Sequence, residues 1–306
     1  MCGTADASLK SGSPGGCPDD SAPRHNDEVT RRSVAPVLLS PLAAAAFPAP
    51  KLNHFYATVN AESYAAIEAS NFLREQFAPF EKRTTVRNDG TYSGLYFYGT
   101  ETYFEFFEAG KGGRKPGDAG LALGIETPGG SSALLAQWQK IQPSLTATVT
   151  RQLDGKPIDW FDMTSFAGDT RERSTVEGFR LFAMEYKPYF LRKWLASAPD
   201  SIRLTDVLAG YCEKLGLAEV RRTSMLDDVN LLHLSGPAPG LQLRARQLAA
   251  AGWPPSAPVR MTPAPTSIGY TRLEFRLKRE QKSASIALGK TSLRIDGKRA
   301  VWTLVS

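Results

Sequence analysis

The feature that most constrains this sequence is an order of expected secondary structure that occurs twice. Alternating apolar residues predict strands, and apolar spacing near the helical repeat predicts helices. The first set runs strand, helix and three strands over residues 52–60, 61–77, 82–86, 92–98 and 102–108. After a break rich in glycine, lysine and proline at 110–117, the order returns over residues 121–126, 131–141, 146–153, 158–162 and 179–186. This duplication of pattern predicts an α+β fold made of two similar units.

The remainder of the chain predicts a further group of elements. Beyond residue 200 we expect helices at 205–215 and 241–251, strands at 219–222 and 230–234, and three or four strands from residue 268 onward. We therefore divide the folded body into a paired-unit domain at 51–195 and an α+β C-terminal lobe with basic strands at 196–306. A body of this size buries roughly 70 to 75% of its unfolded surface, so its core needs neither a disulfide nor a metal.

Residues 1–50 have the features of an export leader. Arg31 and Arg32 precede a short apolar run at 33–47 that ends in small residues, which is the order of a secretory signal. Two prolines interrupt the run, so it is unsuited to spanning a bilayer. We expect a periplasmic or secreted protein with a Sec or Tat-type leader and translation starting near Val29; the alternative is a cytoplasmic protein with a disordered tail.

The three cysteines do not support a disulfide framework. Cys2 and Cys17 lie in the leader, which leaves only Cys212 in the body. Because Cys212 lies in an expected helix with no base nearby in sequence, we interpret it as a small buried thiol.

The basic residues are concentrated at the C-terminal end. The net charge is +6, and residues 240–306 carry 12 basic and 3 acidic side chains. These basic residues alternate with apolar ones, which is typical of a solvated strand face. Clustered arginine and lysine also suit an anion-binding or polymer-binding surface. No helix-turn-helix, zinc-finger or RNA-binding signature accompanies them, so nucleic acid is not the favoured partner.

Two short strings carry a resemblance to a known superfamily. The first expected strand contains Leu-Asn-His-Phe-Tyr at 52–56, and the last strand of the first unit contains Tyr-Phe-Glu-Phe-Phe at 103–107. Together with the paired β-α-β-β-β order, they resemble the vicinal oxygen chelate superfamily, the glyoxalase and bleomycin-resistance-like folds, over residues 52–190. The resemblance implies a cupped mixed sheet followed here by a C-terminal β-rich extension.

The resemblance also implies a metal site. In that superfamily a histidine of a first strand and a glutamate of a last strand commonly bind a divalent metal. Carried over by position, the ligands are His54, Glu105 and Glu185, a donor set that suits Zn, Mn, Fe or Ni. The second unit departs from the pattern, because its first strand at 120–125 has no histidine.

His54 and Glu105 are the candidate catalytic residues. His54 shares a strand face with Tyr56 and can look into a cup or be a hydrogen-bonded structural histidine. Glu105 lies between Tyr103 and Phe107 on its face, where a carboxylate is costly to bury without a partner. Either residue therefore has a structural alternative to its role in a site.

Tyrosines supply the candidate ligand contacts. Tyr56, Tyr96, Tyr98 and Tyr103 are placed to line a cup, although aromatic strand residues also form ordinary cores. We interpret His233 as a structural histidine. No Gly-x-Ser-x-Gly elbow supports a hydrolase, and the glycine-rich strings lack the context of a phosphate-binding loop.

The sequence thus predicts an exported metal-dependent glyoxalase-like enzyme that acts on a small oxygenated substrate by Lewis-acid catalysis. It would be a lyase, isomerase or dioxygenase of the vicinal oxygen chelate type. The alternative is a non-catalytic protein that binds a small ligand in the same cupped fold without a metal. We expect a small-molecule partner and no membrane span.

Overall fold

The computed structural model describes residues 48–170, 173–174, 178–195, 202–254 and 256–305. All described residues belong to one compact unit, Ala45–Ser306. The leader expected at residues 1–50 therefore lies almost wholly outside the described residues. Among the helices that are described, none has both the length and the apolar composition needed to cross a membrane.

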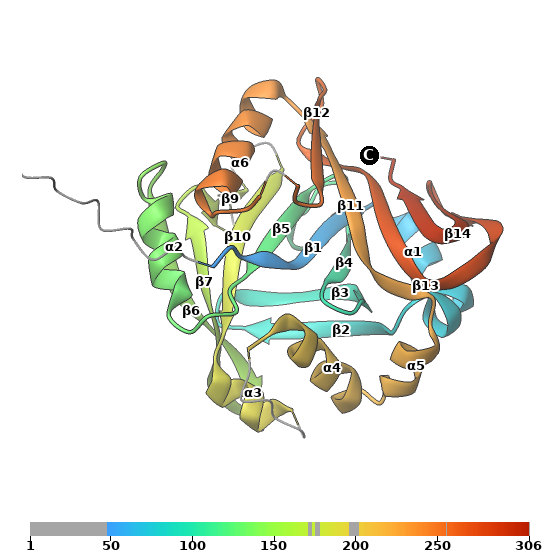
Figure 1. Ribbon diagram of the computed structural model, residues 1–306, viewed down its shortest axis with the longest axis horizontal. Helices are drawn as coiled ribbons and strands as arrows, with labels where there is room; N and C mark the ends of the chain where they lie inside the picture. Colours follow the sequence, from blue (N-terminus) through green and yellow to red (C-terminus); the bar gives the residue numbers. More distant parts are fainter. Residues whose placement is uncertain (1–47, 171–172, 175–177, 196–201, 255, 306) are drawn as a thin grey trace, which may run out of the picture. The chain divides into compact units, whose positions relative to one another are not determined.

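Eight strands form a mixed sheet that closes into a barrel (Figure 1). They are β1 (Lys51–Val59), β2 (Phe80–Arg87), β3 (Gly90–Tyr98), β4 (Tyr103–Glu108), β5 (Ala119–Gly124), β6 (Ser144–Leu153), β7 (Lys156–Phe166) and β10 (Phe179–Tyr186). Their order around the barrel is β1-β4-β3-β2-β6-β7-β10-β5. Each half of the barrel thus comes from one predicted unit, and the expected α+β class with a mixed sheet is confirmed.

The two halves meet along two seams. β1 lies parallel to β4 of its own half and antiparallel to β5 of the other half. At the second seam β2 and β6 meet at the residue pair Arg87 and Arg151. A short ladder of β8 (Asp169–Thr170) and β9 (Arg173–Ser174) lies between β7 and β10 in the sequence.

β4 is buried on both of its faces, and this two-sided burial positions the site. Alternate strand residues point to opposite faces. Phe104 and Phe106 pack outward, with ring centroids 6.3 and 4.8 Å from that of Trp302. Tyr103 and Glu105 instead line a cavity inside the barrel. One face of the strand therefore builds the core, and the other builds a site.

A second sheet packs against the outside of the barrel. It contains β11 (Leu226–Gly236), β12 (Val259–Pro263), β13 (Gly269–Leu288) and β14 (Thr291–Thr303), in the order β12-β11-β13-β14. Trp302 of β14 carries the contact with the barrel phenylalanines, so the sheet and the barrel share one hydrophobic core. His233 belongs to this sheet, with its Nε2 2.9 Å from Glu274 Oε1, and does not line the barrel cavity.

Helices close the ends and sides of the two sheets. They are α1 (Ala61–Ala69), α2 (Gly130–Trp138), α3 (Pro188–Trp194), α4 (Leu204–Lys214), α5 (Ala218–Thr223) and α6 (Ala238–Ala250), with short turns η1 (Leu73–Phe77) and η2 (Lys111–Gly113). Asn60 caps α1 by accepting a hydrogen bond from the Ser63 N–H. In α4, Cys212 is fully buried, and burial raises the pKa of its thiol to about 11.

Three details of the expected elements are wrong. The helix expected at 61–77 is interrupted, because Ser70 has extended backbone angles between α1 and η1. The strand expected at 219–222 is helix α5, where Glu219 and Arg222 form an i,i+3 ion pair that suits a helix. The three or four C-terminal strands are two long ones after β12, because β13 continues through irregularities in its pairing until the turn at Gly289, which has φ of 63°.

Candidate functional site

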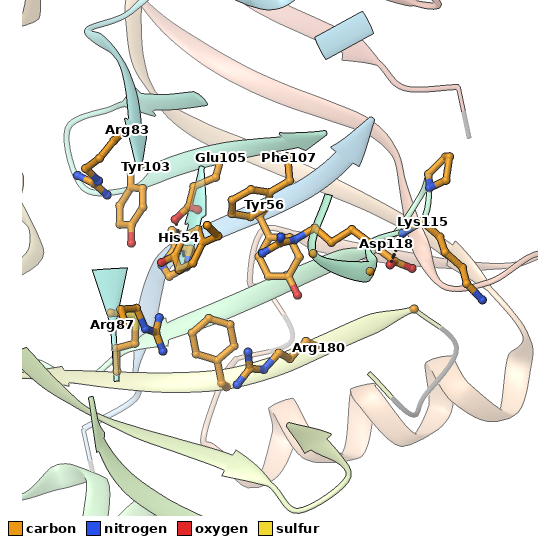
Figure 2. A pocket seen from close by; sticks show the side chains of 18 of the residues that line it. His54, Tyr56, Arg83, Arg87, Tyr103, Glu105, Phe107, Lys115, Asp118 and Arg180 are labelled. Carbon is orange, nitrogen blue, oxygen red and sulfur yellow. Dashed lines mark hydrogen bonds and ion pairs between the residues drawn. The ribbon is translucent and has the colours of Figure 1, made fainter. Parts of the chain in front are cut away.

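The barrel encloses a cavity of about 650 Å³. Side chains of both halves line it, together with residues 112–116 of the segment between β4 and β5. A cavity of this size is typical of a small-molecule site. Figure 2 shows His54, Tyr56 and Glu105 close together on its wall.

His54 and Glu105, predicted from separate strings, are neighbours in the cavity. β1 and β4 are parallel, and His54 lies opposite Tyr103 while Tyr56 lies opposite Glu105. The His54 Nε2 and Glu105 Oε1 atoms are 3.7 Å apart. The His54 ring also stacks on Tyr103, with a centroid distance of 4.5 Å and an interplanar angle of 19°. The structure thus brings together two of the three predicted metal ligands.

His54 is a neutral imidazole in this environment. Burial, and then the positive charges of Arg87 and Arg180, lower its pKa from 6.5 to about 3. The Nδ1 atom lies 2.8 Å from Asn53 Oδ1. Because an amide oxygen only accepts, Nδ1–H donates to Asn53, and Nε2 is the unprotonated nitrogen on the side of Glu105.

Glu105 is poised to exchange a proton near neutral pH. Burial raises its pKa from 4.5 to about 7, although Arg83, Arg114 and Arg87 oppose this shift. Only 5% of the residue surface is exposed. Since His54 is uncharged, its contact with Glu105 is no ion pair, and the carboxyl group can act as an acid or a base.

Arginines are the part of the site that the sequence did not reveal. Arg83 and Arg87 of β2, Arg180 of β10 and Arg114 of the β4–β5 segment all line the cavity. Arg83, Arg87 and Arg114 lie in polar or glycine-rich stretches, so the sequence around them does not indicate a cavity. Arg180 shares a strand face with Phe182 on β10, and this was the one available sign of a charge that points inward.

Two of these arginines have carboxylate partners and two do not. Arg83 donates to Glu81 Oε2 over 3.0 Å, and Arg87 donates to both oxygens of Asp89 over 2.7 and 2.6 Å. Among the described residues, no carboxylate forms an ion pair with Arg114 or Arg180. Arg180 donates to the sulfur of Met163 over 3.4 Å, and burial lowers its pKa.

Glu185 does not join His54 and Glu105. Its carboxylate accepts hydrogen bonds from the Gly129 and Ser131 N–H groups over 2.6 and 2.8 Å at the start of α2. The preceding residue, Met184, lines the cavity, so the alternation of β10 turns Glu185 to the opposite face. Its expected place in a shared metal site is wrong, and its observed role is to cap a helix.

The four predicted tyrosines divide into two pairs. Tyr56 and Tyr103 line the cavity, whereas Tyr96 and Tyr98 do not. The Arg83 guanidinium lies 4.0 Å above the Tyr96 ring and donates to the Tyr98 hydroxyl over 3.3 Å. Arg83 therefore takes the place at the wall that those two tyrosines were expected to occupy.

The residues present do not fit the metal site that the resemblance implies. His54 and Glu105 are two donors, and the position opposite His54 on β5 is Ala122, which supplies no ligand. The described residues contain no group of three or more histidine, cysteine or acidic side chains arranged to hold a metal ion. The arginines around the two donors also disfavour a divalent cation.

Comparison with protein families assigns the chain. Residues 52–304 match the family model described as a family of unknown function, DUF5829. The chain belongs to this family. The match covers the barrel and the second sheet together, whereas no curated protein matches the sequence.

A solved structure offers a distant likeness. A triple mutant of 4-hydroxymandelate synthase from Streptomyces coelicolor aligns with 13% sequence identity and a TM-score of 0.33. The alignment covers 81% of this DUF5829 chain and 59% of the synthase chain. A likeness at this level carries no functional argument, so membership of the vicinal oxygen chelate superfamily stays a prediction.

Proposed function

We propose that this protein binds a small organic anion inside the barrel and acts on it by proton transfer at Glu105. The observation that carries the proposal is the environment of Glu105. Its pKa is raised to about 7, and its Oε1 lies 3.7 Å from a neutral imidazole. The same cavity contains Arg180, an arginine without a carboxylate ion pair among the described residues. An acid–base group thus stands beside an unused anion anchor.

Arg180 would orient the substrate. A guanidinium binds a carboxylate or phosphate through paired, charge-assisted hydrogen bonds. Binding there would hold an adjacent carbon atom near the His54–Glu105 pair. The ring faces of Tyr103 and Phe182 beside His54 would exclude water from that position.

Glu105 would then move one proton. Its ionised carboxylate takes a proton from a carbon next to a carbonyl group, and the electron pair of the C–H bond moves to the carbonyl oxygen. The resulting enolate is stabilised by the surrounding arginine charges. Return of the proton from Glu105 restores the carboxylate and completes the cycle.

This chemistry replaces the metal-dependent form expected from the resemblance. Lewis-acid catalysis by a protein-bound metal calls for a donor set larger than His54 and Glu105 supply. We therefore propose that arginines, in place of a metal, stabilise the negative charge of the enolate. The substrate stays a small oxygenated molecule, as the sequence predicts.

The test is hydrogen exchange on a probe of known chemistry. Pyruvate and 2-oxobutyrate carry a carboxylate and exchangeable protons next to a carbonyl, and exchange in D₂O is followed by proton NMR. We expect the wild-type protein to accelerate exchange and Glu105→Gln to slow it about 100-fold or more. Exchange at the buffer rate in the wild type, with the probes bound, would contradict the proposed catalysis.

A non-catalytic binding protein is the second candidate. The favouring observation is that arginines and aromatic rings dominate the wall, with a single close pair of acid–base groups. This candidate predicts saturable binding of the same probes in the wild type and in Glu105→Gln, no accelerated exchange in either, and weaker binding in Arg180→Gln.

We also propose export, on the strength of the leader sequence at residues 1–50. Expression of the full chain in a bacterial host, followed by fractionation and N-terminal sequencing, tests it. We expect a mature start near Phe47 in the periplasm or medium. Recovery of intact residues 1–50 from the cytoplasm would contradict export.

A further inference from the structure

The glycine-rich segment at residues 110–117 forms part of the cavity wall. Gly110, Gly112, Gly113 and Gly117 all have positive φ, between 60 and 87°, a conformation that glycine adopts without strain. The segment closes on itself, because the Gly110 N–H donates to the Arg114 carbonyl over 2.8 Å. It is thus a shaped loop that presents basic residues to the cavity.

Arg114 and Lys115 are the basic residues of this loop, and both line the cavity. The Arg114 guanidinium lies 4.1 Å from the centroid of the Phe107 ring. The Lys115 N–H donates to Asp118 Oδ2 over 2.7 Å, which fixes the backbone beside the cavity. The loop therefore holds the Arg114 guanidinium beside Phe107 at the wall, with the exposed Lys115 next to it in the sequence.

Arg180 and Arg114 lie on different segments of the wall, Arg180 on β10 and Arg114 on the loop between β4 and β5. Burial raises the pKa of Tyr56 to about 12, and the positive charges of Arg180 and Arg114 both oppose this rise. In Figure 2, Arg180 lies near Tyr56 and His54, whereas Lys115 comes from a separate segment of chain beyond Asp118.

Carboxylates of the described residues do not balance the charges on the wall. After Arg83 and Arg87 are assigned to Glu81 and Asp89, the basic residues without an ion pair among the described residues are Arg114, Lys115 and Arg180. The lining carboxylates are Glu105 and Asp118. With Glu105 ionised, Glu105 and Asp118 leave one positive charge uncompensated, and the excess rises to two once Glu105 has taken up the substrate proton.

We infer that the ligand of the barrel cavity is a small organic dianion, with one anionic group on Arg180 and the other on Arg114. This inference rests on the proposed function, since it specifies the substrate of the same site. The shared chemistry is two anionic groups on one short skeleton, either two carboxylates or a carboxylate and a phosphate. Such a molecule would span the wall across Tyr56 and Glu105.

Calorimetric titration with matched probes tests the inference. 2-Oxobutyrate has one carboxylate, 2-oxoglutarate has two, and phosphoenolpyruvate has a carboxylate and a phosphate. We expect the dianions to bind about tenfold tighter than 2-oxobutyrate, which is the effect of one further charged hydrogen-bonded group. Whichever dianion binds tighter identifies the second anionic group.

Three variants separate the two anchors. Arg114→Gln should reduce dianion affinity to that of 2-oxobutyrate and leave 2-oxobutyrate unchanged, whereas Arg180→Gln should weaken all three probes. Lys111→Gln is the matched control, because Lys111 is exposed on the same loop and does not line the cavity. It should bind like the wild type.

The failures of the two proposals are distinguishable. Equal affinity for one and two anionic groups, with no effect of Arg114→Gln, overturns the dianion inference while the proposed function stands. No saturable binding of any probe, or binding that is insensitive to Arg180→Gln, overturns both.

Discussion

Two sets of charged side chains lie on opposite sides of β10, and they differ in whether their charges are paired. On the outer side, Arg244 of α6 and Asp169 of β8 are each about 1% exposed and form two parallel contacts of 2.5 and 2.9 Å. Arg244 also donates to the Phe179 carbonyl, and Asp169 accepts from the Leu181 N–H. On the inner side, Arg180 has no such carboxylate among the described residues.

This difference separates a structural charge from a functional one. Together, Arg244 and Asp169 contact the backbone on both sides of Arg180, at the Phe179 carbonyl and the Leu181 N–H, so the pair fixes α6 to the barrel and its charges cancel. The cavity arginines keep charge in excess, which is costly unless a ligand is bound. The closed pair, Arg244 with Asp169, therefore stabilises the fold. The open cluster, which is the set of cavity arginines around His54 and Glu105, indicates a site.

The largest expected effect comes from breaking the closed pair. Arg244→Met should lower the free energy of unfolding by about 3–5 kcal/mol, because Asp169 would remain buried without its partner. Urea denaturation followed by tryptophan fluorescence measures this change. The double variant Arg244→Met with Asp169→Leu removes both charges and should recover much of the loss. A loss of under about 1 kcal/mol in the single variant would contradict the structural role.

The second prediction concerns the pH dependence of stability in the open cluster. The pKa of Glu105 is raised in the folded protein, so Glu105 makes stability fall as pH rises from about 4.5 to about 7. The pKa of His54 is lowered, so His54 makes stability rise with pH between about 3 and about 6.5. The two slopes oppose each other between pH 4.5 and 6.5.

Single variants should expose each slope. Relative to the wild type, Glu105→Gln should add an upward slope of about 1.4 kcal/mol per pH unit in that window, and His54→Gln a downward slope of the same size. Urea denaturation across pH 4.5 to 6.5 measures both. Parallel pH profiles for all three proteins would contradict the assigned protonation states.

The site was predictable from the sequence only where one face of a strand is distinctive. His54 stood out as a histidine in the first expected strand, and Glu105 because it lies between Tyr103 and Phe107 on its strand face. Glu185 stood out for the same reason, and its phase with Phe179 and Leu181 was read correctly. Both faces of β10 are buried, however, so phase alone did not tell the cavity from the outer core.

The arginines were harder to foresee for a physical reason. β2 is polar at almost every position, and the sequence does not distinguish the inward Arg83 and Arg87 from the outward Lys82. Arg114 lies in a glycine-rich segment that resembled a phosphate loop without its helix. Only closure of the barrel brings these cations beside Glu105, from segments that are distant in the sequence.

The third prediction sharpens the comparison between the two sets of charges. Arg180→Gln removes an arginine that pairs with no carboxylate of the described residues, so it should change the free energy of unfolding by less than about 1 kcal/mol. This contrasts with the loss expected for Arg244→Met. Denaturation under the same conditions measures both variants. A large destabilisation by Arg180→Gln would show that Arg180 is structural and would remove the basis for treating the cluster as open.

The smallest expected effect is that of divalent metals. The open cluster surrounds His54 and Glu105 with arginine charges, which repel a cation, and the two donors alone bind one weakly. Addition of Zn²⁺, Mn²⁺, Fe²⁺ or Ni²⁺ should therefore leave the melting temperature of the wild type unchanged, and elemental analysis after dialysis should show no stoichiometric metal. His54→Ala and Glu105→Ala serve as the matched controls. Stoichiometric metal in the wild type that is lost in both variants would overturn this view of the cluster and restore Lewis-acid catalysis as the mechanism.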